Sequence, residues 1–147
     1  MLENEMWERY RGVHPEAVEH EAWSFCGGGR IGDELAGLVL EGRKTATASA
    51  HALYMAEGAP LPSEGGLSII LLSTGEAACI IRTTGVRVCR FDEVTPEHAF
   101  KEGEGDRSLK YWRAVHEDVF SKELEGSGLH FGHDMLVVCE TFEIVFR

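Results

Sequence analysis

Two residues of this 147-residue chain, Lys44 and Thr47, have side chains of the types that together perform nucleophilic chemistry. A threonine hydroxyl is a poor nucleophile until a base takes its proton. A lysine can be that base only if burial or a cationic neighbour lowers its pKa from about 10.4, and Arg43 is adjacent in sequence. We therefore predict a site at this stretch, with Thr47 attacking a substrate and Lys44 activating the threonine.

The chain around these two residues is expected to run from the end of a helix into a strand. Gly42 is predicted to end the helix, because glycine adopts the positive φ that a chain leaving a helix usually needs. Residues 45–50 consist of threonine, alanine and serine, which let a ligand approach a strand closely. In a regular strand Lys44 and Thr47 would point to opposite faces. Both can reach one pocket only if Lys44 lies in the turn before the strand.

The amino-acid composition limits both the class of protein and the partners that it can bind. A hydrophobic content of 44% in 147 residues predicts a single domain, with a helical part over 1–42 and a sheet with inserted helices over 43–147. The formal charge of −11 argues against an extended nucleic-acid surface, which needs many lysines and arginines. No apolar run approaches the roughly 20 residues of a membrane span, so no membrane contact is expected. An acidic N-terminus and four widely spaced cysteines predict a cytoplasmic protein with reduced thiols.

The first part of the chain is predicted to be mainly helical. Residues 3–11 and 17–22 have the pattern of short helices. Asp33 is expected to cap a third helix, which ends near Gly42. The prolines and glycines within residues 51–66 indicate a long surface loop of the kind that lines binding sites.

The second part combines strands with two helices. Thr95 is predicted to cap a short helix, and either Asp106 or Ser108 to cap the longest one. Even positions of the last strand are apolar except for Glu140. Strands are expected over 67–72 and 135–146, and residues 76–91 are expected to form either one long strand bent at Gly85 or two short ones. This order predicts an α+β fold with a small, mostly antiparallel, barrel-like sheet flanked by helices.

Three segments of the sequence carry a resemblance to a known family. They are 42–47 (Gly-Arg-Lys-Thr-Ala-Thr), 97–106 with its His-Ala-Phe-Lys-Glu-Gly core, and Tyr111-Trp112 followed by His116. Together they resemble the ASCH domain family, a relative of the PUA RNA-binding fold. The likeness covers nearly the whole chain and is to the longer bacterial branch, which has extra N-terminal helices. It implies a PUA-like β-barrel with a cleft for RNA or a nucleoside.

The resemblance also implies an activity and a set of residues. In an amidohydrolase branch that acts on acetylated cytidine, a lysine, a threonine three residues later and a distant glutamate are catalytic, and they match Lys44, Thr47 and Glu102. Glu102 would orient Lys44 or carry a proton to the leaving amine of an acylated pyrimidine nucleoside. No cofactor and no metal are expected. Candidate ligand-binding residues are Arg43, Thr45, Tyr54, Arg107, Ser108 and Tyr111.

Other interpretations stay open. Shorter members follow the threonine strand with an arginine, where this chain has Ala48-Ser49-Ala50, so the substrate is not settled by the resemblance. The chain could instead bind or cleave short RNA, as a longer family member does, or sense a nucleotide-like ligand without turnover. Lys44 could be a solvated lysine at a helix end. His98 and Glu102 have metal-ligand spacing, but two such groups without a third more often form a surface pair.

Overall fold

A computed structural model describes residues 1–147 as helices packed around one five-stranded sheet. The helices are α1 (Glu3–Val13), α2 (Gly29–Leu40), α3 (His51–Glu57), α4 (Pro96–Glu102) and α5 (Leu109–Leu124), with short 3-10 turns η1 (Phe25–Gly27) and η2 (Phe91–Glu93). The strands are β1 (Glu21–Trp23), β2 (Ala46–Ala50), β3 (Leu67–Leu71), β4 (Ala77–Arg90) and β5 (Leu136–Phe146). None of the helices has the length and apolar character that crossing a membrane requires.

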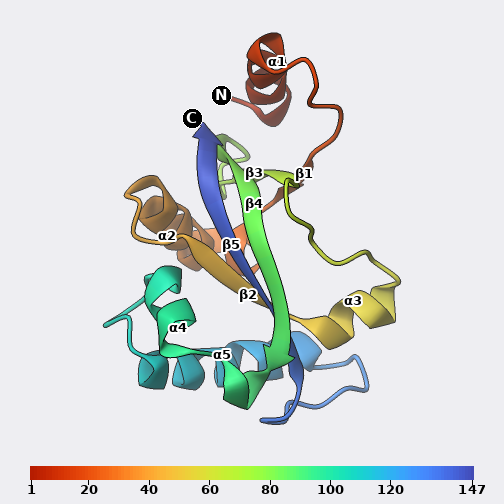
Figure 1. The fold of residues 1–147 in the computed structure, drawn as a ribbon, viewed down its shortest axis with the longest axis vertical. Coiled ribbons are helices and arrows are strands. Elements are labelled where there is room, and N and C mark those ends of the chain that lie inside the picture. Colours follow the sequence, from red (N-terminus) through yellow and green to blue (C-terminus); the bar gives the residue numbers. More distant parts are fainter.

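The sheet is a curled half-barrel with strand order β1-β3-β4-β5-β2 (Figure 1). Only β1 and β3 are parallel, and the other pairs are antiparallel. β4 is one long strand whose pairing with β5 shifts register between Thr83 and Gly85, where the bend was expected. The predicted α+β fold with a mostly antiparallel, barrel-like sheet is therefore confirmed, and β1 and β2 are its two open edges.

Three hydrophobic clusters hold the helices on this sheet. One forms around Trp112 and Phe120 of α5, one around Val39 of α2, and one around Met6 and Trp7 of α1. In Figure 1, α1 covers one end of the long β4–β5 pair, and α3, α4 and α5 gather at the other end. Burial of these apolar side chains fixes α2 and α5 against the sheet, and both helices border the site described below.

Two predictions for the N-terminal part are wrong. Residues 17–22 do not form a helix, because Glu21–Trp23 pair as strand β1 with residues 68–70 of β3. Asp33 does not cap α2, which begins at Gly29. Its carboxylate instead accepts hydrogen bonds from the backbone and hydroxyl of Ser73. Both differences come from contacts with β3 and the turn after it, which override local preference.

The prediction of a loop over residues 51–66 is correct only for the second half of that segment. Residues His51–Glu57 form α3, which ends at Gly58 in the left-handed conformation, and the remainder to Gly66 is irregular. The other signals for helix ends are confirmed. The Thr95 side chain accepts from the His98 amide, and the Ser108 side chain accepts from the Tyr111 amide.

Gly103 allows the end of α4 to pack directly on the residue before Lys44. Its φ is +74°, and a Cβ there would lie 2.4 Å from the Arg43 carbonyl oxygen. We expect Gly103→Ala to lower the free energy of unfolding by about 1–3 kcal/mol, measured by urea denaturation, because it adds a clash to the strain of a positive φ. Gly126→Ala is the matched control, since Gly126 has φ +75° and no atom near its missing Cβ. Equal losses in the two variants would show that the contact with Arg43 is unimportant.

Candidate functional site

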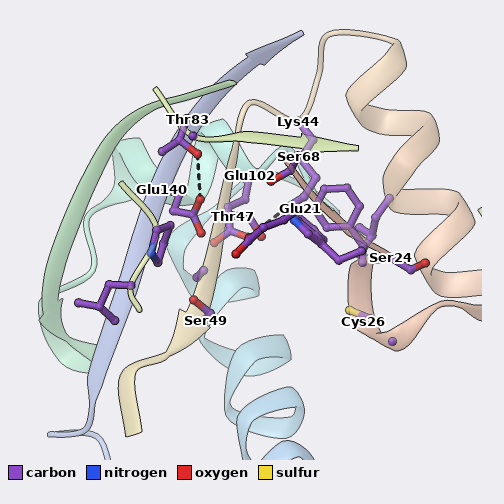
Figure 2. Close-up of a pocket in the computed structure, with 18 of the residues that line it drawn as sticks. Glu21, Ser24, Cys26, Lys44, Thr47, Ser49, Ser68, Thr83, Glu102 and Glu140 are labelled. Carbon is purple, nitrogen blue, oxygen red and sulfur yellow. Dashed lines mark hydrogen bonds and ion pairs between the residues drawn. The ribbon is translucent and has the colours of Figure 1, made fainter. Parts of the chain in front are cut away.

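The curled sheet and the helices around it enclose a cavity of about 1810 Å³. All five strands line it, through Glu21, Ser68, Thr83, Glu140, Thr47 and Ser49, and α5 and the η1 segment contribute to other walls (Figure 2). The volume exceeds the roughly 300–1,000 Å³ usual for a small-molecule pocket. The cavity therefore has room for a nucleoside and for water beside it.

Lys44 lies in the turn that leads into β2. Gly42 has φ +78°, and the amides of Arg43 and Lys44 both donate to the Leu38 carbonyl, at 3.0 and 3.1 Å. Since β2 begins only at Ala46, Lys44 does not follow the alternation of the strand. The geometric condition derived from the sequence is met, and the side chains of Lys44 and Thr47 line the same cavity.

The Lys44 ammonium is buried between two carboxylates. Its Nζ lies 3.2 Å from Oε1 of Glu102 and 3.0 Å from Oε2 of Glu104. Lys44 is 2% exposed and Glu102 1%, so Lys44 is not a solvated lysine at a helix end. An ammonium in these contacts has one N–H left, and the ring of Phe25 lies 5.4 Å away.

Glu102 accepts from four donors on three segments of the chain. Burial alone would raise its pKa, but the Lys44 charge and the hydrogen bonds from His116 and His98 outweigh burial and hold the pKa of Glu102 well below its usual range. Glu102 is therefore an ionised, fully engaged carboxylate. Its donors are Lys44 Nζ, His98 Nε2 at 2.7 Å, Trp112 Nε1, and His116 Nε2 at 3.5 Å.

The contacts of His116 favour a proton on both of its ring nitrogens. Its Nδ1 lies 2.9 Å from the Trp112 carbonyl, which can only accept, and its Nε2 faces the ionised Glu102. Burial lowers the pKa of His116, but the hydrogen bond to Glu102 and the charge of that carboxylate raise it by more. The ring stacks on Trp112 with centroids 4.1 Å apart, which fixes its orientation.

Thr47 stands apart from this network in one respect. It is half-buried on β2, and its hydroxyl has no hydrogen bond to another side chain. On the same strand, Ser49 shares a hydrogen bond of 2.9 Å with the Tyr54 hydroxyl from α3. The structure thus brings the predicted residues Lys44, Thr47, Glu102 and Tyr54 to one cavity, which Tyr111 also lines.

The other predicted ligand-binding residues do not line the cavity. The Arg43 guanidinium donates to the carbonyls of Gly103 and Gly105, at 2.6 and 2.7 Å. Arg107 donates to the carbonyls of Phe100 and Arg43, and so also ties the α4–α5 loop to the turn before β2. Thr45 contacts the Lys101 carbonyl, and Ser108 caps α5. A role of these four residues in ligand binding stays a prediction.

Three cavity residues were not assigned to the site from sequence. Glu104 follows Glu102 in a Glu-Gly-Glu-Gly run, and His116 lies one helical turn after Trp112. Glu140 was recognisable only as the one polar residue on the apolar side of the last strand. Each of these signals was visible in the sequence, but none shows that the residues meet.

A metal site is conceivable here from the ligand types alone. Glu102, Glu104 and His116 offer atoms that all lie within 4.8 Å of one another. The Lys44 ammonium, however, contacts both carboxylates and already supplies the positive charge at that position. A divalent cation would have to displace it, so the donor set does not fit a resident metal well.

Comparisons of the sequence and of the structure with known proteins identify the same family. The sequence model of the ASCH domain matches residues 21–146. A crystal structure of an ASCH domain from Lactobacillus crispatus JV V101 is 33% identical, with a TM-score of 0.91, over 98% of this chain and 94% of that chain. Protein EF3133 from Enterococcus faecalis V583 is 35% identical, with a TM-score of 0.88, over 97% of this chain and 87% of that chain.

A more distant structure shares the fold alone. The hypothetical protein PH0355 is 18% identical with a TM-score of 0.53, over 77% of this chain and 93% of that chain. No curated protein matches the sequence. The match of the ASCH sequence model to most of the chain and the two related structures confirm the resemblance stated above, and the chain belongs to the ASCH domain family.

Proposed function

We propose that this protein hydrolyses the amide of an acylated pyrimidine nucleoside, such as acetylated cytidine, in the cavity of the half-barrel. One observation carries the proposal: the unengaged hydroxyl of Thr47 and the buried Lys44–Glu102 ion pair line the same cavity. Amide hydrolysis requires a nucleophile and a group that stabilises the tetrahedral oxyanion. These residue types supply both.

The contacts of Lys44 favour one distribution of roles. An ammonium that donates to two carboxylates has no free lone pair, so we assign it to the oxyanion and not to activation of Thr47. The remaining N–H of Lys44 stabilises the developing negative charge while Thr47 attacks the acyl carbon. Glu102 is the positioning residue, because its ionised carboxylate holds the ammonium in place.

The charge of the cavity favours a nucleoside over RNA. No arginine lines the cavity, and its two lysines are both paired, Lys44 with Glu102 and Glu104, and Lys122 with Asp118 at 3.0 Å. A phosphate would therefore find no free cation to neutralise it. Unpaired carboxyl groups along the walls add to the negative charge, among them Glu19, Glu21 and Glu64.

The direct test is release of acetate by the purified protein. Acetylated cytidine and its 5′-phosphate are incubated separately with the protein, and products are separated by chromatography. We expect the nucleoside to be hydrolysed faster than its phosphate, because of the acidic walls. Absence of release from a panel of acylated nucleosides would remove this proposal. Tight binding without turnover would instead indicate a sensor, and binding of short RNA in a salt titration would indicate an RNA-binding module.

A further inference from the structure

A second carboxyl group lies beside the proposed nucleophile, on the neighbouring strand. In the antiparallel pairing of β2 with β5, Glu140 is the residue directly opposite Thr47. Residues opposite each other in such a pair point to the same face, with Cβ atoms about 4.5–5.5 Å apart. Both side chains line the cavity, and Figure 2 shows them directed into it from adjacent strands.

The surroundings of Glu140 contain no cation that pairs with it. Thr83 of β4 donates to its Oε2 at 3.4 Å, and β2 presents only the uncharged Thr47 and Ser49. The charged or titratable groups that face it are Glu21 from β1 and Tyr54 from α3. Burial, with a smaller contribution from the charge of Glu21, raises the pKa of Glu140 to about 7 despite the hydrogen bond from Thr83.

The two other residues assigned to the chemistry of Thr47, Lys44 and Glu102, are both engaged by other side chains. Glu102 accepts from four donors and its pKa lies well below the usual range, so it does not take up a proton near neutral pH. The Lys44 ammonium donates to two carboxylates. Activation of Thr47 still requires a proton acceptor. Glu140 lies directly opposite Thr47 and has no cation partner, and it is therefore the group placed to accept this proton.

We propose that Glu140 is the proton carrier for Thr47, an inference that rests on the amide hydrolysis proposed above. The Glu140 carboxylate takes the Thr47 hydroxyl proton as Oγ bonds to the acyl carbon. The carboxyl then gives that proton to the leaving amine as the C–N bond breaks, which leaves an acyl-Thr47 ester. Water attacks the ester, one of its protons goes to Glu140, and Glu140 returns a proton to Thr47 Oγ as the acid is released.

The test uses an activated ester, so that it does not depend on the natural substrate. The intact protein is mixed with p-nitrophenyl acetate at pH values on both sides of 7, and release of p-nitrophenol is followed. The rate of ester cleavage by the Thr47→Ala variant is subtracted from each measured rate, because it reports cleavage that does not depend on Thr47. We expect the Thr47-dependent rate to rise with pH with a midpoint at about 7, since Glu140 must be ionised to accept the proton.

The informative variant is Glu140→Gln, which keeps an oxygen to accept from Thr83. We expect its Thr47-dependent rate to fall by about 10²–10⁴-fold and to lose the rise with pH. Glu143→Gln is the matched control, because Glu143 lies on the same strand, is exposed and pairs with Arg82 outside the cavity. It should keep the wild-type rate and midpoint.

The possible results separate this inference from the proposed function. A Glu140→Gln variant with the wild-type rate and midpoint overturns the proton carrier, even if the wild-type protein releases acetate from acetylated cytidine. Absence of any Thr47-dependent ester cleavage overturns it as well. Conversely, a midpoint at about 7 that Glu140→Gln removes supports the carrier, even if no acylated nucleoside is hydrolysed and the proposed substrate is thereby rejected.

Discussion

Replacing Glu102 with alanine is expected to lower the free energy of unfolding by about 3–5 kcal/mol. The variant removes the acceptor for four donors, three of them buried, including the Lys44 ammonium, which then keeps only Glu104. Removing one partner of a buried ion pair is strongly destabilising, because the remaining charge loses part of its compensation. The measurement is urea denaturation followed by tryptophan fluorescence.

The control for this variant is Glu143→Ala. Glu143 also pairs with a cation, Arg82, but both side chains are about half exposed. An exposed ion pair contributes at most about 1 kcal/mol, so this variant should be nearly as stable as the wild type. A Glu102→Ala variant no less stable than Glu143→Ala would mean that the buried network contributes little to folding.

Glu102 also gives the stability of the protein a defined pH dependence. Because its pKa is lowered in the folded state, its contribution is complete above the unfolded-state value of about 4.5 and is lost as the pH falls below it. Denaturation at descending pH should therefore show a steeper loss for the wild type than for Glu102→Gln, which has no carboxyl to protonate. Parallel losses in the two proteins would assign the acid sensitivity to other groups.

Replacing Thr47 with alanine is expected to reduce acetate release from acetylated cytidine by at least about a thousandfold, as loss of a nucleophile does in other enzymes. The substitution removes a hydroxyl with no side-chain partner from a half-buried strand position. Stability should therefore change by no more than about 1 kcal/mol. Chromatography of the products and a thermal unfolding curve measure the two effects.

Thr84→Ala is the matched control for Thr47→Ala. Thr84 lies on β4, is exposed, and its hydroxyl shares a hydrogen bond with the Thr141 hydroxyl outside the cavity. We expect this variant to retain wild-type turnover. If Thr47→Ala also turned over normally, the attacking group would have to be a different one, and water activated at Glu140 would be the first to examine.

The parts of the fold that were predicted from sequence depend on short-range chemistry. Thr95 and Ser108 cap helices because their side chains reach amides three residues ahead, which requires no other part of the chain. The turn at Gly42 follows from its freedom to adopt a positive φ. This turn places Lys44 before the strand, which meets the condition under which Lys44 and Thr47 can reach one pocket.

The errors occur where distant segments meet. Residues 21–23 form a strand because they pair with the edge of β3. Asp33 binds Ser73 because the turn after β3 lies against α2. Neither partner is recognisable from the local pattern, since backbone hydrogen bonds carry little sequence signature.

Local sequence patterns were enough to predict the fold class, most of the helix ends and the stretch that carries Lys44 and Thr47. The contacts and electrostatics of the site follow from the packing of distant segments. Lys44 is buried between Glu102 and Glu104, and burial raises the pKa of Glu140 to about 7. The physical reason is that charge and desolvation act over a few ångströms through space, between residues that lie 58 and more positions apart in the chain.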